Sequence, residues 1–229
     1  MTGNENQIMP TTQHYLSVVV LRSVPLFSGL GESELEKLST ICGRRRVERG
    51  AFIVRAGETI DSLYVLLTGR AKVVNTDEEG RGEIILAWLG PGEFFGEMGL
   101  IDGSPRSASV VATESCELLV LGKDAFHRCL QDNFLIAQRL MQILVRRLRE
   151  ADRKIESLAL LDVYGRIARL LLDMSVEEGG RRIVKKKISK QDMARMIGAS
   201  REMVSKVMRD LEMSGYIASE GDGLAILKS

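Results

Sequence analysis

The sequence predicts an α+β fold in successive parts: a β-rich N-terminal half that closes into an antiparallel barrel or jelly roll, one long helix, and a C-terminal winged helix-turn-helix. Three observations support this order. Short β-rich runs cut by glycines lie between Val47 and about Leu121, a heptad pattern follows, and two capped helices joined by a glycine turn come last. We place the boundaries at residues 1–23 (tail and short helix), 24–132, 133–161 and 162–229.

The composition is that of a globular chain with an uneven distribution of charge. Of 229 residues, 45% are hydrophobic and 28% charged, and the net charge is +1. From Val163 onward, 13 lysines and arginines stand against 9 aspartates and glutamates, whereas the rest of the chain has 19 against 22. A basic C-terminal part favours a polyanionic partner, although a solvated face would explain the charge if it stood alone.

Cysteine usage and hydropathy indicate a reduced compartment. The three cysteines (Cys42, Cys116 and Cys129) are odd in number and far apart in the sequence, and His14 and His127 have no clustered partners. We therefore expect free thiols and no metal site. No apolar run approaches the roughly 18 residues of a membrane helix, and the polar N-terminus lacks a signal-peptide core. We expect a cytoplasmic protein that does not contact the membrane.

The N-terminal half predicts two helices and then strands. Residues 1–14 read as a flexible tail, and Leu16–Leu21 and Glu32–Cys42 as short helices, although the valines of the first would also suit a strand. The β-rich runs are 52–54, 63–69, 70–75, 83–89 and 116–121, and "TDEEGRGE" is typical of a hairpin turn. Regular spacing of short strands indicates an antiparallel barrel or jelly roll.

A sustained heptad seam predicts a long helix that pairs with a second copy of the chain. Apolar or small residues recur at steps of 4 and 3 from about residue 133, before helical pattern resumes at Leu160–Met174. Burial against the helix's own domain is the alternative, but a helix this long would overhang a small barrel. The seam consists of Ala137, Met141, Leu144, Leu148, Ala151, Ile155 and Leu158.

The last segment reads as a helix-turn-helix with a wing. "SVEEGGRR" breaks the helical pattern and "RIVKKKI" favours a short strand. Ser189 caps a helix, with Asp192 three residues on, and Gly198 supplies the left-handed turn before Ser200 caps the next helix. The inward residues are Met193, Ala194 and Ile197 on the first helix and Val204, Val207, Met208 and Leu211 on the second. "GYIASEGDGLAIL" predicts two strands around a tight turn.

The outer face of the second helix carries side chains that suit base edges. Arg201 and Lys206 match the acceptors of guanine, Glu202 can accept from cytosine N4, and Ser205 shares the face. An ordinary helical hairpin with a charged outer face is the alternative. Helix, glycine turn, capped helix and wing together favour binding to double-stranded DNA.

The segment "GEFFGEMGLIDGSPRSASV" (Gly92–Val110) contains an acid, an arginine and hydroxyl groups among several glycines, which leave the backbone accessible. The Arg106 fork and the Ser107 hydroxyl suit a phosphate, and a short helical turn after Gly96 would present more N–H donors. Glu97 would repel a phosphate but accept hydrogen bonds from a ribose. The segment therefore describes a nucleotide pocket, with simple pairing of Glu97 and Arg106 as the open alternative.

These motifs resemble the cAMP receptor protein/fumarate-nitrate regulator superfamily of bacterial transcription regulators, and most of all its cAMP receptor protein branch. "GEFFGEMGL…RSA" resembles the phosphate-binding cassette, "LALLDVYGRIARLLL" the hinge, and "ISKQDMARMIGASREMVSKV" the helix-turn-helix. The resemblance implies ribose contacts from Gly96, Glu97, Met98 and Gly99, and phosphate contacts from Arg106, Ser107 and Ala108. It implies DNA phosphate contacts from Ser189, Gln191 and Ser200, and reading of a palindromic GTGA-type site by Arg201, Glu202 and Lys206.

Three departures affect what the resemblance implies. Ala151 and Asp152 stand where the cAMP receptor proteins place a Thr-Ser pair that contacts adenine, and Asp152 suits the N1–H and N2–H₂ edge of guanine. Lys206 replaces a bidentate arginine, and Met203 replaces a phosphate-contacting threonine. Cyclic AMP remains the favoured effector, with cyclic GMP and cyclic di-GMP as alternatives.

The predicted function is a homodimeric DNA-binding transcription regulator, working with RNA polymerase, that a cyclic nucleotide switches through a hinge at Leu161–Asp162. A ligand-independent regulator is one alternative. A redox, haem or gas sensor is another, but the clustered cysteines or barrel histidines it needs are not visible in the sequence. An enzyme is disfavoured, since no catalytic dyad, Walker loop or metal cluster appears.

Overall fold

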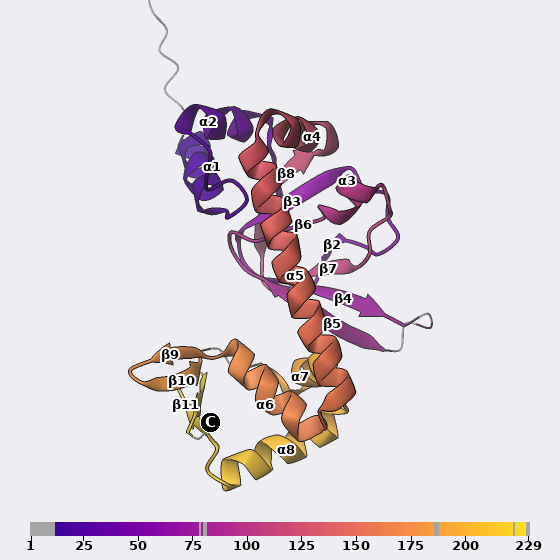
Figure 1. Ribbon diagram of the computed structural model, residues 1–229, viewed down its shortest axis with the longest axis vertical. Coiled ribbons are helices and arrows are strands. Elements are labelled where there is room, and N and C mark those ends of the chain that lie inside the picture. The colour runs from indigo at the N-terminus through magenta and orange to yellow at the C-terminus, as the bar shows by residue number, and fades with distance from the viewer. Residues whose placement is uncertain (1–11, 78, 80–81, 186–187, 222, 228–229) are drawn as a thin grey trace, which may run out of the picture. The chain divides into compact units, whose positions relative to one another are not determined.

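The computed structural model describes residues 12–77, 79, 82–185, 188–221 and 223–227, and the side chains of all of these except 12–17 (Figure 1). Contacts divide the chain into two compact units. The first contains the chain up to Asn75 together with Ala87–Val145, and the second contains Thr76–Leu86 together with the chain from Arg146 onward. Several predictions fall in part outside the described residues: the tail up to residue 11, the hairpin turn at Glu78, Gly80 and Arg81, the strand at Lys186 and Lys187, and the wing turn at Asp222.

Two helices open the first unit. Helix α1 spans Thr12–Ser23 and α2 spans Glu32–Ile41, so the two predicted helices are confirmed. The tail prediction was too long, because Thr12–His14 already belong to α1. At the start of α2, the carboxylate of Glu34 accepts a hydrogen bond from the backbone N–H of Gly31 at 2.8 Å, which satisfies a donor that the helix itself leaves open.

Within the described residues, eight strands form the β-roll, and the jelly-roll prediction is confirmed. The pairs β1–β8, β3–β8, β3–β6, β2–β7 and β4–β7 are antiparallel. One sheet has the order β1 (Gly43–Val47), β8 (Cys116–Gly122), β3 (Ser62–Thr68), β6 (Phe94–Phe95). The other has the order β2 (Phe52–Val54), β7 (Ser109–Ala112), β4 (Ala71–Thr76), β5 (Glu83–Leu89).

Strand β3 is buried on both faces, and its two faces enter different cores. Leu63 and Val65 pack with the helices, whereas Tyr64 and Leu66 pack between the two sheets. Successive side chains of a strand point to opposite faces, so one strand supplies both cores. Helix α4 (Lys123–Asp132) contributes the fully buried Phe126 to the core that Leu63 and Val65 form with the helices.

Helix α5 (Phe134–Leu160) confirms the predicted long helix, and α6 (Val163–Met174) follows it. The chain breaks helical conformation at Leu161 and Asp162, where the hinge was expected. There the Asp162 side chain accepts a hydrogen bond from the N–H of Gly165 at 2.8 Å and so caps α6. The break therefore has a local sequence cause.

The second unit contains the helix-turn-helix and a four-stranded sheet. Helix α7 spans Lys190–Ile197, Gly198 is left-handed at φ 62°, and α8 spans Arg201–Met213. The sheet order is β11 (Ile217–Glu220), β12 (Gly223–Ile226), β10 (Arg181–Val184), β9 (Val176–Glu178). The two wing strands are confirmed. The predicted end of the helical pattern at 175–182 is confirmed, and β10 confirms the strand predicted from Arg182, while β9, which pairs with β10 as a hairpin, was not predicted.

Candidate functional site: the glycine-rich cassette and the helix-turn-helix

The segment after β6 forms a tight cradle that only glycine permits. Gly96 has φ 89° and Gly103 has φ 75°, with the short helix α3 (Met98–Asp102) between them, as the sequence predicted. A Cβ at position 96 would strike the guanidinium of Arg106. A Cβ at position 99 would strike the Ile60 side chain and the Ser104 carbonyl. Both glycines therefore permit a close approach of backbone to side chains.

Arg106 is a buried arginine, only 6% exposed, held by groups distant in the chain. Its Nη2 donates to the carbonyl of Ser62 at 2.8 Å and its Nη1 donates to the carbonyl of Gly96 at 3.1 Å. Asp61 lies 3.9 Å from Nη2, and the Tyr64 ring centroid lies 5.5 Å from Cζ. Burial lowers the pKa of Arg106, while Tyr64 and then Asp61 oppose that shift. The result is a fixed fork of donors in a low-dielectric site.

Glu97 occupies the N-cap position of α3 and is only 2% exposed. Its negative charge raises the pKa of Arg106, although less than Tyr64 and Asp61 do. A buried carboxylate near a buried guanidinium gives one acceptor group and one donor group within the same cradle. This combination suits a ligand that carries both hydroxyl groups and an anion.

The remaining cassette residues surround this pair on the surface. Met98 is 54% exposed, Ser107 is exposed and Ala108 is half-buried. The Ser107 hydroxyl lies 3.9 Å from the Met98 sulfur. The structure therefore brings together the residues assigned to the ribose and phosphate sides, with Arg106 donating directly to Gly96.

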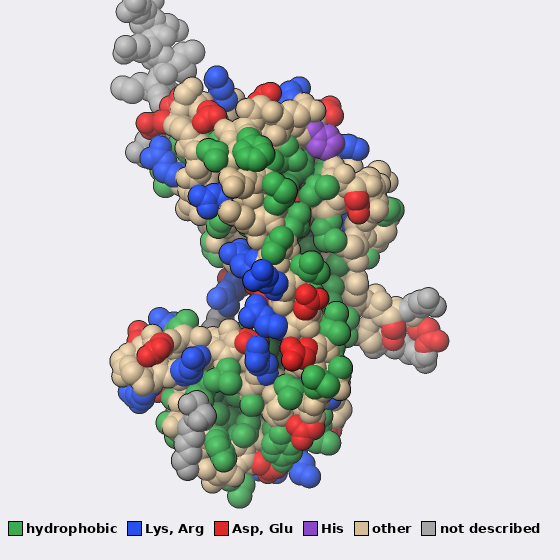
Figure 2. Space-filling view, in the orientation of Figure 1, with side chains coloured by type: hydrophobic (Ala, Val, Ile, Leu, Met, Phe, Trp, Pro, Cys, Tyr) green, Lys and Arg blue, Asp and Glu red, His purple; other side chains and the backbone are tan. Residues whose placement is uncertain are grey.

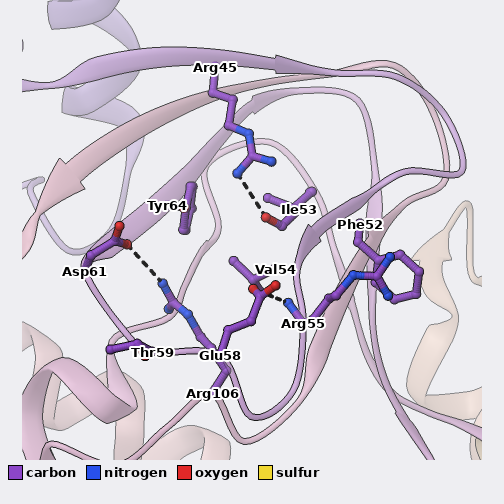
Figure 3. Close-up of a pocket in the computed structure, with 10 residues that line it drawn as sticks. All are labelled: Arg45, Phe52, Ile53, Val54, Arg55, Glu58, Thr59, Asp61, Tyr64 and Arg106. Atoms are coloured by element: carbon purple, nitrogen blue, oxygen red, sulfur yellow. Dashed lines mark hydrogen bonds and ion pairs between the residues drawn. The ribbon is translucent and has the colours of Figure 1, made fainter.

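A cavity of about 440 Å³, which the sequence did not predict, lies beside Arg106 (Figure 3). Of the predicted cassette residues, only Arg106 lines it. The sequence signal was the run Arg44–Arg46, whose middle residue reaches the cavity from β1. The lining residues are Arg45, Phe52, Ile53, Val54, Arg55, Glu58, Thr59, Asp61, Tyr64 and Arg106.

Ala151 and Asp152 lie on the part of α5 that belongs to the second unit, and both are exposed. The seam around them is mostly exposed as well. Leu148 is 62% and Ile155 is 64% exposed, while Ala137 and Leu144 are half-buried. Hydrophobic side chains gather along this helix in Figure 2. A single chain thus leaves an apolar stripe uncovered.

The helix-turn-helix has the capped geometry that the sequence predicted. The Ser189 hydroxyl accepts from the N–H of Asp192 at 3.0 Å and donates to the Asp192 carboxylate at 2.8 Å. The Ser200 hydroxyl accepts from the N–H of Met203 at 3.2 Å. Val204 and Val207 are fully buried, whereas Met208 and Leu211 are only half-buried.

The predicted base-reading side chains point away from this core. Arg201, Glu202 and Lys206 are exposed, as is Gln191 on α7, and Ser205 is half-buried. In the core behind them, the Arg166 guanidinium donates to the carbonyl of Ile197 at 2.8 Å and holds the end of α7. Exposed polar side chains on a rigid helix are what reading of a DNA groove requires.

The described residues contain neither a cluster of metal-ligating side chains nor a membrane-spanning helix. No group of three or more potential metal-ligating side chains occurs there, and the three cysteines are free thiols. His127 instead makes a 2.7 Å hydrogen bond with the carbonyl of Leu100. None of the described helices is sufficiently long and apolar to cross a membrane.

Comparison with known families finds two domain types. Residues 44–133 match the cyclic nucleotide-binding domain and residues 165–228 match the Crp-like helix-turn-helix domain. The chain is similar to the cAMP-activated global transcriptional regulator Vfr of Pseudomonas aeruginosa, with 36% identity over 202 residues that cover 84% of this chain and 92% of that protein. It is also similar to the CRP-like cAMP-activated global transcriptional regulator of Mycobacterium tuberculosis, with 30% identity over 92% of this chain and 95% of that protein.

Solved structures agree with the sequence comparison. The c-di-GMP responsive global regulator CLP of Xanthomonas campestris matches with a TM-score of 0.72 and 28% identity, over 87% of this chain and 100% of that chain. The catabolite activator protein of Thermus thermophilus matches with a TM-score of 0.54 and 34% identity, over 88% and 93%. These relatives are regulators rather than enzymes.

Proposed function

Since the chain belongs to the CRP family of cyclic nucleotide-responsive transcription regulators, we propose that it is a homodimer that binds a palindromic DNA site under the control of cyclic AMP. The observation that carries the proposal is one chain with both a buried Arg106–Glu97 cradle and an exposed base-reading face on a capped helix. A regulator that reads chromosomal DNA must reside with that DNA, so we propose a cytoplasmic location. RNA polymerase is the proposed downstream partner.

In the cradle, Arg106 and Ser107 would hold the cyclic phosphate, with Ala108 alongside. A planar guanidinium pairs with two phosphate oxygens, and burial strengthens that attraction. Glu97 would accept from a ribose hydroxyl, because its carboxylate cannot face a phosphate without repulsion. Gly96, Met98 and Gly99 would shape the sugar side, where Cβ atoms at the two glycines have no room.

Cyclic AMP is favoured because the named relatives in Pseudomonas aeruginosa and Mycobacterium tuberculosis are cAMP-activated. Cyclic GMP and cyclic di-GMP remain the alternatives, because Asp152 suits a guanine edge and the similar CLP regulator responds to c-di-GMP. Calorimetric titration with the three nucleotides side by side tests the choice. Tighter binding of either guanine nucleotide than of cyclic AMP would contradict it.

The double variant Ala151→Thr with Asp152→Ser sharpens that test. It restores the hydroxyl pair and removes the acceptor for guanine, so the ratio of cyclic AMP to cyclic GMP affinity is expected to rise about tenfold, the value of one charge-assisted hydrogen bond. Arg153→Ala, a neighbouring change on the same helix, is the control. An unchanged ratio would remove these two positions from the ligand site.

Dimerisation would cover the exposed stripe of α5. The variant Leu148→Glu places a charge in the seam and is expected to give a monomer in sedimentation experiments. Arg149→Glu makes a similar acidic change one residue on, outside the heptad seam, and should leave the dimer intact. A wild-type chain that sediments as a monomer would end the proposal.

The helix-turn-helix would read a GTGA-type half-site, with Arg201 and Lys206 on guanines and Glu202 on cytosine. Ser189 has its hydroxyl hydrogen directed to Asp192, so it would contact a phosphate less directly than Ser200 or Gln191. The test is anisotropy of a labelled palindromic duplex with and without nucleotide. Equal DNA affinity in both conditions would favour a ligand-independent regulator.

A further inference from the structure

We propose that the cavity beside Arg106 is a second ligand site, separate from the nucleotide cradle, that takes a small phosphorylated metabolite. The cavity has a volume of about 440 Å³, within the range of small-molecule sites in proteins. Its walls come from β1, β2, the β2–β3 loop and β3, and Arg106 alone belongs also to the cassette. Figure 3 shows Arg45 entering from one end and Arg106 from the other, with Tyr64 beside them.

Three arginines line the cavity, and each is held in place by a different contact. Arg45 donates to the carbonyl of Ile53 at 3.0 Å, and its Cζ lies 6.0 Å from the Tyr64 ring centroid. The Cζ of Arg55 lies 3.7 Å from the centroid of the Phe52 ring. Fixed guanidinium groups lose little conformational freedom when they bind an anion, so this arrangement is preorganised.

The two carboxylates in the cavity wall leave part of this positive charge available. Asp61 pairs with Arg106 at 3.9 Å, and Glu58 accepts a hydrogen bond from the backbone N–H of Arg55 at 2.8 Å. Among the described residues, neither the Arg45 nor the Arg55 side chain forms an ion pair. The Arg45 guanidinium thus offers unused donors to the cavity, whereas Figure 3 shows the Arg55 side chain turned toward the Phe52 ring.

A phosphate monoester is the ligand class that fits these donors. Its group carries close to two negative charges near pH 7, and the planar fork of Arg45 can engage two of its oxygens. The apolar remainder of the ligand would lie against Ile53 and Val54 in the cavity wall. Inorganic phosphate carries the same anionic group, so the experiment compares binding of a phosphate ester with binding of the free ion.

The experiment is calorimetric titration of the full chain with phenyl phosphate, inorganic phosphate and succinate. Saturable binding of phenyl phosphate is expected, with inorganic phosphate weaker and succinate weaker again. Stronger binding of inorganic phosphate would identify the free ion as the ligand and overturn the ester. Equal binding of succinate would overturn phosphate recognition, and no saturable binding of any probe would overturn the site.

Arginine variants test whether phenyl phosphate binds in this cavity. Arg45→Ala is expected to weaken phenyl phosphate binding about tenfold or more. Arg46→Ala is the matched control, because Arg46 lies next on β1 but pairs with Glu48 on the surface at 3.3 Å. An equal loss in Arg46→Ala would indicate diffuse surface charge and contradict the proposal. If Arg45→Ala does not fold, Arg45→Gln keeps a donor for Ile53 while removing the charge.

Nucleotide titration of the same variants keeps this inference distinct from the proposed function. Arg45→Ala should bind the cyclic nucleotide as the wild type does, since Arg45 lies outside the cassette. Loss of phenyl phosphate binding with retained nucleotide binding supports two sites. Parallel loss of both ligands in Arg45→Ala would show one continuous site and overturn the second one.

Discussion

The two ligand-facing parts of the molecule are built in opposite ways. In the β-roll, Arg106 is buried and donates to carbonyls of residues 44 and 10 positions away in the chain. In the helix-turn-helix, the caps at Ser189 and Ser200 act over three residues, and the side chains that would read bases are exposed. One site depends on the assembled roll, and the other depends mainly on its own two helices.

The two sites should therefore respond differently to single substitutions. A buried charge held by distant partners couples ligand binding to the whole β-roll, so a local change disturbs both binding and folding. An exposed reading face can change its side chains with little effect on folding, because nothing packs over them.

Replacement of Arg106 should have the largest effect. Arg106→Ala removes the donors for the phosphate, and we expect nucleotide affinity to fall about 100-fold or more, as for other buried charged partners. Calorimetry measures the loss, and sedimentation should still show the dimer. Arg46→Ala, an exposed arginine in the same unit, should change affinity less than twofold. Near-normal binding by Arg106→Ala would remove the cradle from the nucleotide site.

A methyl group at position 99 should destabilise the β-roll alone. Gly99→Ala forces a Cβ against Ile60, and overpacking of this kind costs about 1–3 kcal/mol. The only tryptophan, Trp88, lies in the first unit and reports its unfolding in urea. Gly122→Ala is the control, since a Cβ there meets nothing within 4 Å. Equal midpoints for the two variants would show that the cradle has spare room.

Loss of a helix cap should have a smaller and more local effect. Ser200→Ala removes the hydrogen bond to the N–H of Met203 and should cost about 1 kcal/mol of helix stability. Far-UV circular dichroism during thermal unfolding would detect this loss, and Trp88 fluorescence should not change. Ser219→Ala on the exposed face of β11 serves as the control. A shift of the Trp88 transition would contradict the local character of this unit.

The smallest expected effect is on the reactivity of a thiol, because Cys42 should be alkylated only slowly in the folded chain. Burial, followed by the nearby Cys129, raises the pKa of Cys42 to about 12, so the neutral thiol persists well above pH 8. Since the thiolate is the reacting species, alkylation of Cys42 at pH 8 should be at least tenfold slower in the folded chain than in urea. Mass spectrometry of digested samples measures the rates. Equal rates would mean that this region opens readily.

Several elements escaped prediction for identifiable reasons. Strand β1 carries three consecutive arginines, so it shows no alternation of apolar and polar residues. Strand β6 has only two residues, and β9 is exposed along its whole length. These strands exist because a neighbouring strand supplies their hydrogen bonds, and a sequence does not reveal which strand that will be.

The features that depend on near neighbours follow directly from the sequence: the caps at Ser189 and Ser200, the left-handed Gly198, the long helix and the break before α6. The burial of Arg106 against Ser62, the entry of Arg45 into a cavity beside it and the role of β3 in two cores depend on the folded arrangement of strands. The two groups of features differ in how far along the chain their interactions act. Caps and helical periodicity act within a few residues, whereas burial and cavities arise from strands that meet only after the chain has folded.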